Sequence, residues 1–238
     1  MGTFFGDLYL RSTLPFLDPR VTRLEADFIG DALQLVAGER VLDLCCGHGR
    51  HLELLRLRGF RAVGLELDTA SLAEMSPLGR TAAVQGDMRH LPFRAGFDAL
   101  FAWYASLFLS ENDAQNRAAL QQAASVLRPG GRMLIHSHNP LSQRREPSSH
   151  FETRLPDGSS VVEDTRFDER TGMLTGHRKR HVAGAIQEGD FQVRCPRLED
   201  HHAWSEDLGL ILESSWGDIQ AAPISETAPD LIVLLRRP

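Results

Sequence analysis

The 238-residue sequence is poor in cysteine and in aromatic side chains, and it has no long apolar run. Its three cysteines include the adjacent pair Cys45 and Cys46 and form no C-x-x-C motif, so no disulfide framework is expected and the chain is interpreted as reduced and cytoplasmic. An uncharged apolar stretch of about 18 residues is absent, and the N-terminus lacks the pattern of a signal peptide, so we expect no membrane partner. Acids outnumber bases by 32 to 26, which makes a nucleic-acid partner unexpected.

Up to about residue 140, short apolar segments alternate with helical patterns. The strand-like segments are apolar on both faces, as buried strands are, and lie at 40–44, 60–65, 81–85, 97–103 and 133–136. The helical patterns cover 19–37, 49–58, a short helix from Thr69 and 110–127, each with a capping residue or a terminating glycine or proline. Strands and helices that alternate across short turns require a parallel sheet with helices on both faces.

After residue 140 the pattern changes to turn signals about 15 residues apart, typical of an antiparallel meander. We expect turns at 156–158, 169–172 and 187–189, then a helix at 198–208 and strands at 210–216 and 231–235 that return to the main sheet. The predicted fold class is α/β, a Rossmann-like, doubly wound, mostly parallel seven-stranded sheet with an antiparallel β insert. The basic run 177–181 is interpreted as the solvent-facing side of a strand, with contact to an anionic substrate as the alternative. Arg194 is either a grip for an acidic substrate or an exposed strand cation.

The segment Val41–His51 is the most informative motif, because a strand ends in an acid and continues through small residues into a helix. Such a loop lets a ligand approach the backbone, and a tight turn without a ligand is the alternative. Leu52 stands where a dinucleotide fingerprint has its third glycine, and no Gly-Lys-Ser or Gly-Lys-Thr follows, which weakens NAD and FAD and excludes a P-loop. Asp43 repels a pyrophosphate but suits an ammonium group, which favours an amino-acid-like cofactor.

Val-Leu-Asp-Leu-Cys-Cys-Gly-His-Gly-Arg-His resembles motif I of the class I methyltransferases that use S-adenosylmethionine, and further matches follow over residues 40–138. Gly64–Asp68 resembles the end of the family's second strand, which implies that Glu66 binds the ribose hydroxyls. Gln85–Arg89 resembles the adenine-binding turn, which implies contacts from Asp87 and Met88. The sequence departs from the family where Cys45 replaces a glycine and where Glu66 replaces the commoner aspartate.

The resemblance implies S-adenosyl-L-methionine as cofactor and a set of residues around it. The expected cofactor-binding residues are Tyr9, Asp43, Cys45, Gly47, Gly49, His51, Glu66, Leu67, Asp87, Met88 and Trp103. The expected catalytic candidates follow the fourth and fifth strands and are Tyr104, His136 and His138, with Ser106 and Asn139 as further residues of an acceptor pocket. Alternatively, the histidines are solvated or hydrogen-bonded side chains without a catalytic role. No metal is expected, because the spacing of the histidines in the sequence is not that of metal ligands.

The expected function is transfer of a methyl group to an O, N or C atom of a small molecule by in-line displacement. Two alternatives stay open, a protein that binds the cofactor without catalysis and a nucleotide-dependent oxidoreductase. By this interpretation residues 1–140 form an N-terminal helical segment and the cofactor-binding core, 141–196 form the insert on the substrate side, and 197–238 complete the core sheet. The expected partner is a small-molecule methyl acceptor, and a homodimer is left open.

Overall fold

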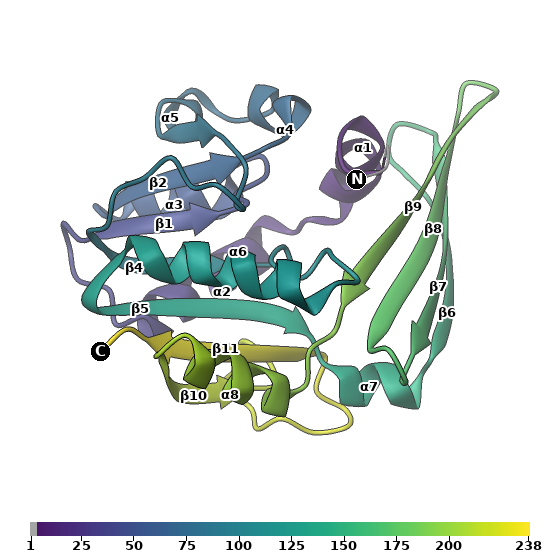
Figure 1. Ribbon diagram of the computed structural model, residues 1–238. Helices are drawn as coiled ribbons and strands as arrows, with labels where there is room; N and C mark the ends of the chain where they lie inside the picture. Colours follow the sequence, from purple (N-terminus) through teal and green to yellow (C-terminus); the bar gives the residue numbers. More distant parts are fainter. Residues whose placement is uncertain (1–3) are drawn as a thin grey trace.

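The computed structural model describes residues 4–238 and contains two β-sheets (Figure 1). The larger sheet has seven strands in the order β10-β11-β5-β4-β1-β2-β3. Its strands are β1 (Arg40–Leu44), β2 (Arg61–Glu66), β3 (Ala83–Gln85), β4 (Phe97–Ala102), β5 (Leu127–His138), β10 (Ile211–Trp216) and β11 (Asp230–Arg236). β1 to β5 pair in parallel, whereas β11 runs antiparallel to both of its neighbours. The predicted mostly parallel seven-stranded sheet is confirmed.

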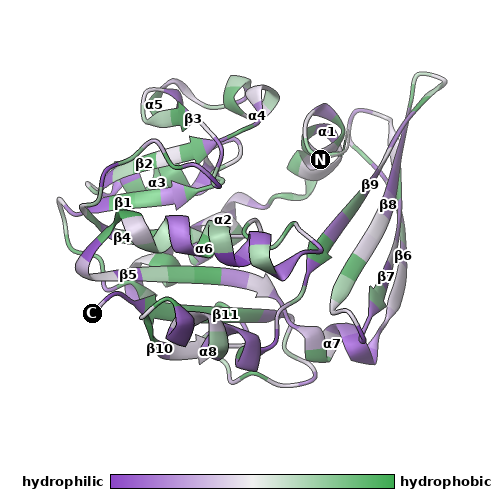
Figure 2. Ribbon diagram, in the orientation of Figure 1, coloured by the Kyte–Doolittle hydropathy of each residue, from purple (hydrophilic) through white to green (hydrophobic). Residues whose placement is uncertain are grey.

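Helices cover both faces of this sheet because its strands are apolar on both sides. One face packs against α6 (Asp113–Val126) and α8 (Leu198–Asp207), and the other against α2 (Pro19–Ala32), α3 (Arg50–Leu57) and α4 (Thr69–Ala73). Alternate residues of β1 point to opposite faces of the sheet. Leu42 lies in the apolar core formed with α6 and α8, and Val41 lies in the core formed with α2, α3 and α4. The short α5 (Pro77–Arg80) leads into β3. Apolar residues dominate β5 and β11 in Figure 2.

Two helix boundaries differ from the prediction by more than one residue. α2 starts where predicted, since Asp18 accepts a hydrogen bond from the Arg20 amide, but it ends at Ala32 rather than at residue 37. Gln34 adopts a left-handed φ of 52° and Val36 is 61% exposed, so the apolar period breaks there. The cap of α6 is Asn112, whose side chain accepts from the Ala114 amide. The predicted start at Ser110 is therefore wrong by two residues.

The smaller sheet is an antiparallel meander in the order β6-β7-β8-β9 and follows the short helix α7 (Pro140–Arg145). Its strands are β6 (Ser148–Arg154), β7 (Ser160–Asp168), β8 (Met173–Val182) and β9 (Ala185–Arg194). The first two predicted turns lie where expected, but the third is wrong because 187–189 lies inside β9. The chain turns instead at Ala183 and Gly184, which both have positive φ, at 48° and 80°.

The N-terminal helix α1 (Asp7–Thr13) and the 3-10 turn η1 (Leu14–Phe16) lie between the two sheets (Figure 1). Phe4 stacks on Phe191 of β9 with ring centroids 4.6 Å apart, and Gly189 has no side chain to obstruct Phe4. Arg11 pairs with Glu74 of the core at 2.8 Å. α1 is thus tied to both sheets. Within residues 4–238, no helix is long and apolar enough to cross a membrane.

Candidate cofactor and active site

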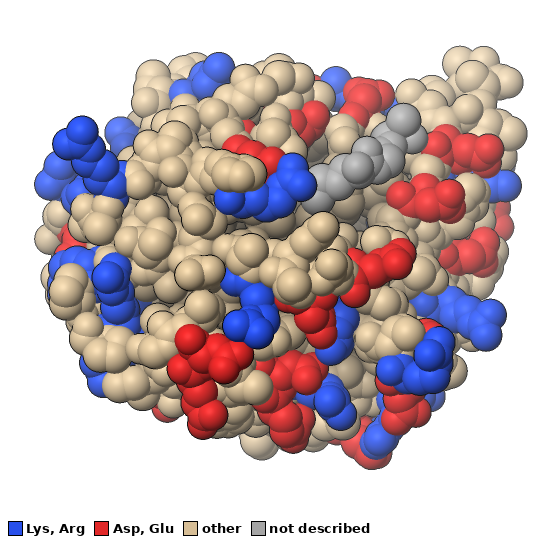
Figure 3. All heavy atoms as spheres, in the orientation of Figure 1, with Lys and Arg blue, Asp and Glu red and all other residues tan. Residues whose placement is uncertain are grey.

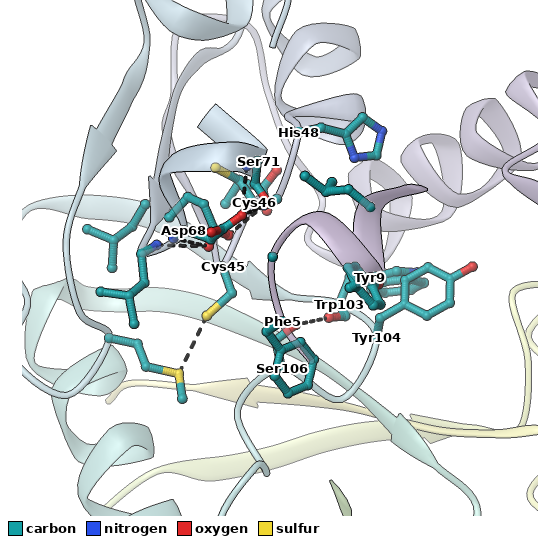
Figure 4. A pocket seen from close by; sticks show the side chains of 18 of the residues that line it. Phe5, Tyr9, Cys45, Cys46, His48, Asp68, Ser71, Trp103, Tyr104 and Ser106 are labelled. Atoms are coloured by element: carbon teal, nitrogen blue, oxygen red, sulfur yellow. Dashed lines mark hydrogen bonds between the residues drawn. The ribbon is translucent and has the colours of Figure 1, made fainter. Parts of the chain in front are cut away.

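A cavity of about 440 Å³ opens at the carboxyl ends of β1, β2 and β4, beneath α1 (Figure 4). This is the edge at which open parallel sheets bind ligands. In Figure 4, Tyr9, Trp103 and Tyr104 gather on one side of the cavity, and Cys45 and Asp68 lie on the other. The predicted cofactor residues that line it are Tyr9, Asp43, Cys45, Gly47, His51, Glu66, Leu67, Asp87, Met88 and Trp103, and Tyr104 joins them.

Gly49 is the one predicted cofactor residue that does not line the cavity. It is the N-cap of α3 with a φ of 81°, and a Cβ built on it would meet the Met75 side chain at 3.5 Å. Its place in the motif is explained by the left-handed backbone conformation, since the contact with Met75 would be an ordinary van der Waals contact. The fold needs glycine here whether or not a ligand binds.

The β1–α3 loop is held in a tight conformation by hydrogen bonds from its backbone amides to β2. Cys45 has a φ of 62°, a left-handed conformation that costs a non-glycine residue about 1–2 kcal/mol. The Cys46 amide donates to the Leu65 carbonyl at 3.0 Å, and the Gly47 amide donates to Glu66 Oε2 at 2.8 Å. Burial raises the pKa of the Cys45 thiol, so this residue stays a neutral, small lining group.

Glu66 is fixed by backbone amides from two segments. Its Oε1 accepts from the amides of Leu67 and Asp68, both at 2.8 Å, while Oε2 accepts from Gly47. A carboxylate offers about four acceptor positions, so about one remains for a ligand hydroxyl. Burial raises the pKa of Glu66, and the three amides act against that shift.

An acidic and a basic side chain border the cavity with buried atoms that have no hydrogen-bond partner within residues 4–238. They are Asp43 Oδ2 and Arg50 Nη2. Burial raises the pKa of Asp43 to about 8, although the charge of Arg50 opposes this. Uncompensated buried polar atoms are costly, so a ligand with one cationic and one anionic group would relieve both. The amino-acid end of S-adenosylmethionine has such a pair, and the residues present therefore fit this cofactor.

Arg50 and its partner Glu25 were not singled out in the sequence. Glu25 lies on α2, is 5% exposed, and pairs with Arg50 and with His51 Nε2 at 3.0 Å. Its Oε1 also accepts from Trp103 Nε1 at 3.3 Å. Burial would raise the pKa of Glu25, but hydrogen bonds from His51 and Arg50 lower it to about 2. The sequence offers only a faint signal for this cluster, an acid at a core-facing position of an amphipathic helix.

The turn after β3 carries Asp87 and Met88. Asp87 accepts hydrogen bonds from the backbone and side chain of Arg89, and these lower its pKa to about 2. Met88 Sδ lies 3.4 Å from Cys45 Sγ, which closes the cavity floor between β1 and β3. Asp87 is therefore an ionised acceptor that already shares its oxygens with an exposed arginine.

The loop after β4 is conformationally strained. Tyr104 and Ala105 both have a φ of 55°, and neither is glycine. Such outliers persist where the surrounding structure enforces them and are common at functional sites. Ser106 donates to the Trp103 carbonyl at 2.6 Å, and the Arg50 guanidinium lies 5.0 Å from the Tyr104 ring centroid. Burial raises the pKa of Tyr104 to about 12, so its hydroxyl stays protonated at neutral pH.

The structure does not bring His136 or His138 to the cavity lining. His136 is 5% exposed, packs behind Trp103 with centroids 4.7 Å apart, and places Nε2 3.2 Å from Asp230 Oδ1. Burial lowers the pKa of His138 to about 4. Asn139, expected in an acceptor pocket, instead caps α7 and donates to two carbonyls of the loop before β11.

Two basic features of the insert have structural partners. Arg194 pairs with Asp113 and Asp200 and is largely buried, so it is not the exposed strand cation of the second interpretation. In the run 177–181, His177 and Lys179 face solvent as predicted, whereas Arg178 and Arg180 are largely buried against Glu163 and Asp157. On the face in Figure 3, acidic and basic side chains are interspersed and form no continuous basic surface.

Comparison with known proteins identifies the class. Residues 41–131 match a family model described as a methyltransferase domain. The chain is 31% identical over 205 residues to the cypemycin N-terminal methyltransferase of a Streptomyces species, covering 84% of each. It is 29% identical over 201 residues to a dTDP-3-amino-3,4,6-trideoxy-alpha-D-glucopyranose N,N-dimethyltransferase of Streptomyces venezuelae, covering 83% of this chain and 79% of that one. The CcbJ methyltransferase from Streptomyces caelestis has a similar structure, with a TM-score of 0.80, 21% identity, and coverage of 94% and 92%.

The fold and the cavity thus define a Rossmann-like enzyme whose ligand site lies at the carboxyl ends of the strands. The chain belongs to the class I S-adenosylmethionine-dependent methyltransferases. Its cofactor is S-adenosylmethionine, and the alternatives of an oxidoreductase and of a non-catalytic binding protein are not favoured.

Proposed function

We propose that the protein transfers the methyl group of S-adenosylmethionine to an amine nitrogen of a small molecule. Asp43 Oδ2 and Arg50 Nη2, buried without a partner within residues 4–238 in the cavity that Glu66 also borders, support the cofactor part of this proposal. The observation that carries the acceptor part is the cavity lining beyond β4, where Tyr104 is the single titratable side chain among the residues described. Among the acceptor atoms open to the family, oxygen, nitrogen and carbon, nitrogen is also the atom named for two relatives, an N-terminal methyltransferase and an N,N-dimethyltransferase.

In this proposal each lining residue has one task. Asp43 faces the ligand ammonium, Arg50 its carboxylate, and Glu66 the ribose hydroxyls. Asp87 and Met88 contact the adenine, while Leu67 packs on one of its faces and Tyr9 covers the site from α1. Cys45, Gly47 and His51 shape the wall around the amino-acid end. Burial lowers the pKa of His51 to about 4, so this side chain is a neutral hydrogen-bonding group.

The acceptor end is proposed to lie beyond β4. The lining there is Thr13, Leu14, Leu17, Tyr104, Ser106 and Leu109. Tyr104 is the single titratable residue of that set, and its pKa near 12 makes it a poor proton acceptor at neutral pH. An amine attacks through its own lone pair and needs no base once it is unprotonated, whereas a hydroxyl does. We assign no proton transfer to His136 or His138, because neither borders the cavity.

The bound cofactor supplies the reactivity, as its sulfonium is a good leaving group for in-line displacement. The residues of this chain align the amine with the methyl carbon and exclude water, an effect worth on the order of 7 to 11 kcal/mol where positioning is good. Trp103 and Tyr104 wall this region, and α1 covers it. We further propose that 1–140 and 197–238 form the cofactor-binding core and 141–196 the substrate side.

We also propose a cytoplasmic enzyme without a nucleic-acid partner. Three free cysteines and a formal charge of −6 support this assignment. We propose a homodimer as the assembly, and light scattering of the purified protein would measure its mass.

Titration calorimetry with S-adenosylhomocysteine tests the cofactor site. Glu66→Ala should weaken binding by about 1 to 3 kcal/mol, because ribose hydroxyls would lose their acceptor. The control is Glu152→Ala, an acid on the exposed strand β6, which should bind like the wild type. Unchanged affinity in Glu66→Ala would overturn the assignment.

Matched pairs of small molecules that differ only in an amine or a hydroxyl test the acceptor. Mass spectrometry after incubation with S-adenosylmethionine should show methyl gain on the amines alone. Methylation confined to the hydroxyl members would show that the acceptor proposal is wrong while leaving the cofactor assignment intact.

A further inference from the structure

Glu25 does not border the cavity itself, but it contacts three side chains that do. It lies on α2, well before the motif loop in the sequence. Its carboxylate forms a salt bridge with Arg50 and hydrogen bonds with His51 Nε2 and Trp103 Nε1. The carboxylate is 94% buried, and the Arg50 side chain is 12% exposed. One acid from α2 therefore joins the start of α3 to the end of β4, on the side of the cavity where Trp103 and Tyr104 lie in Figure 4.

The two terminal nitrogens of Arg50 are used differently. Nη1 donates to Glu25 and also to Thr22 Oγ1 at 2.9 Å, so both of its partners come from α2. Nη2 is buried and has no partner within residues 4–238. The planar guanidinium has a fixed fork geometry, so holding one nitrogen sets the direction of the other.

No salt bridge joins Arg50 to Asp43 within residues 4–238, where Asp43 Oδ2 and Arg50 Nη2 both lack a partner. Both residues border the cavity, and the charge of Arg50 acts on the carboxyl of Asp43. Loss of Glu25 would remove a partner that fixes the guanidinium, so Nη2 would no longer be held in one direction.

We propose that Glu25 is a positioning residue that holds Arg50 so that Nη2 meets the carboxylate of the cofactor's amino-acid end. This inference rests on the proposed function, since it assigns a task within the same cavity. Glu25 touches no ligand in this account and acts through Arg50. It also orients Trp103 by accepting a hydrogen bond from the indole nitrogen.

The test compares two ligands that differ in the amino-acid end. S-adenosylhomocysteine carries the carboxylate, whereas 5′-methylthioadenosine retains the adenosine and sulfur but lacks it. Glu25→Gln keeps the size of the side chain and removes its charge. Calorimetry should show a roughly tenfold or greater loss of affinity for S-adenosylhomocysteine, the range expected for a charge-assisted hydrogen bond, with 5′-methylthioadenosine unchanged within about twofold.

A double-mutant cycle sharpens this result. Arg50→Gln should show the same selective loss, and Glu25→Gln combined with Arg50→Gln should be no worse than Arg50→Gln alone, because both changes remove one interaction. If Glu25→Gln does not fold, Arg50→Lys replaces it. A lysine can pair with Glu25 through its single nitrogen but leaves no second nitrogen for the ligand, so the same selective loss is expected.

Asp27→Asn is the matched control. Asp27 lies on the same helix and also ties α2 to the end of α3, through Arg58 at 2.6 Å, but it is an exposed acid away from the cavity. It should leave the ratio of the two affinities unchanged. Equal losses for both ligands in Glu25→Gln, or no loss for either, would overturn the positioning role. Failure of the wild type to bind either ligand would instead overturn the proposed function, and this inference with it.

Discussion

Asp43 carries a buried carboxyl group whose Oδ2 has no hydrogen-bond partner among residues 4–238. Natural proteins keep such groups where function needs them, at a cost in stability. The pKa of Asp43 rises with burial from 3.8 to about 8, so at neutral pH the free protein holds a proton there. A ligand ammonium would favour loss of that proton. The residue is thus suited to binding a cation and poorly suited to an empty cavity.

Replacing Asp43 with asparagine should stabilise the fold and weaken binding of S-adenosylhomocysteine. Between about pH 4 and pH 8 the unfolded chain has lost the Asp43 proton while the native state retains it, so wild-type stability falls as pH rises through this window. Asparagine has no proton to lose. The advantage of Asp43→Asn should therefore grow with pH by about 1.4 kcal/mol per unit within the window.

Urea unfolding of both proteins at pH 5 and pH 8 measures this advantage. The change Asp31→Asn, at an exposed acid of α2 that has no salt bridge within residues 4–238, provides the control. A stability difference between wild type and Asp43→Asn that is the same at both pH values would contradict the buried, protonated state of Asp43.

Single residues were predictable where a local motif specifies them. Asp43, Glu66 and Asp87 each follow a strand at a spacing that the sequence displays, and all three border the cavity. Glu25 could not be found in this way, because its contact with Arg50 spans 25 residues and depends on how α2 packs against α3. The sequence also did not indicate whether the His136 side chain faces the cavity. Its position after a strand suggests access to the cavity, but Trp103 lies against it.

At the scale of elements, the strands of the core sheet were the easiest to predict, because each is a short run apolar on both faces. Turns were harder. The β8–β9 turn was expected at a glycine that in fact lies in β9, where Gly189 makes room for α1. The turn itself lies at Ala183 and Gly184, and both residues adopt left-handed conformations. Two successive residues with positive φ are typical of a type I′ hairpin, for which alanine is a poor choice.

The change Ala183→Asn should therefore stabilise the protein. Asparagine tolerates the left-handed conformation that alanine adopts at a cost, and Asn-Gly is the favoured pair for this turn. The expected gain is about 0.5 to 1 kcal/mol, a rise in Tm of roughly 1 to 4 °C for a chain of this size. Differential scanning calorimetry measures it, with Ala185→Asn as a control one residue into β9. A fall in Tm for Ala183→Asn would mean that the hairpin does not use this turn.

At the scale of the whole molecule, the cavity is closed by an element that neither sheet contains. α1 lies between the sheets, and two sets of contacts join the N-terminal segment to the smaller sheet. Gly176 leaves space for the Phe191 ring, on which Phe4 stacks, and Arg178 donates to Ser12 Oγ and Thr13 Oγ1. The sequence predicts the insert as a meander, but these contacts join residues far apart in the chain. The link between insert and cofactor cover therefore had to come from the structure.

Phe191→Ala should loosen α1 while leaving the core sheet intact. The substitution removes the ring that packs on Phe4 at 4.6 Å, and a lost apolar contact of this kind is worth roughly 1 to 3 kcal/mol. Amide hydrogen exchange in α1 should speed up by about tenfold for each 1.4 kcal/mol lost, and exchange in β1 and β4 should stay slow. S-adenosylhomocysteine should bind more weakly, because ordering α1 would then oppose binding.

Ile186→Ala provides the control, since Ile186 lies on the same strand and is 59% exposed. It should leave exchange in α1 and ligand affinity unchanged. Equal acceleration in α1, β1 and β4 would show that Phe191 supports the fold as a whole. Unchanged exchange in α1 would show that the insert does not hold the cover of the cavity, and Tyr9 would then depend on the core alone for its position.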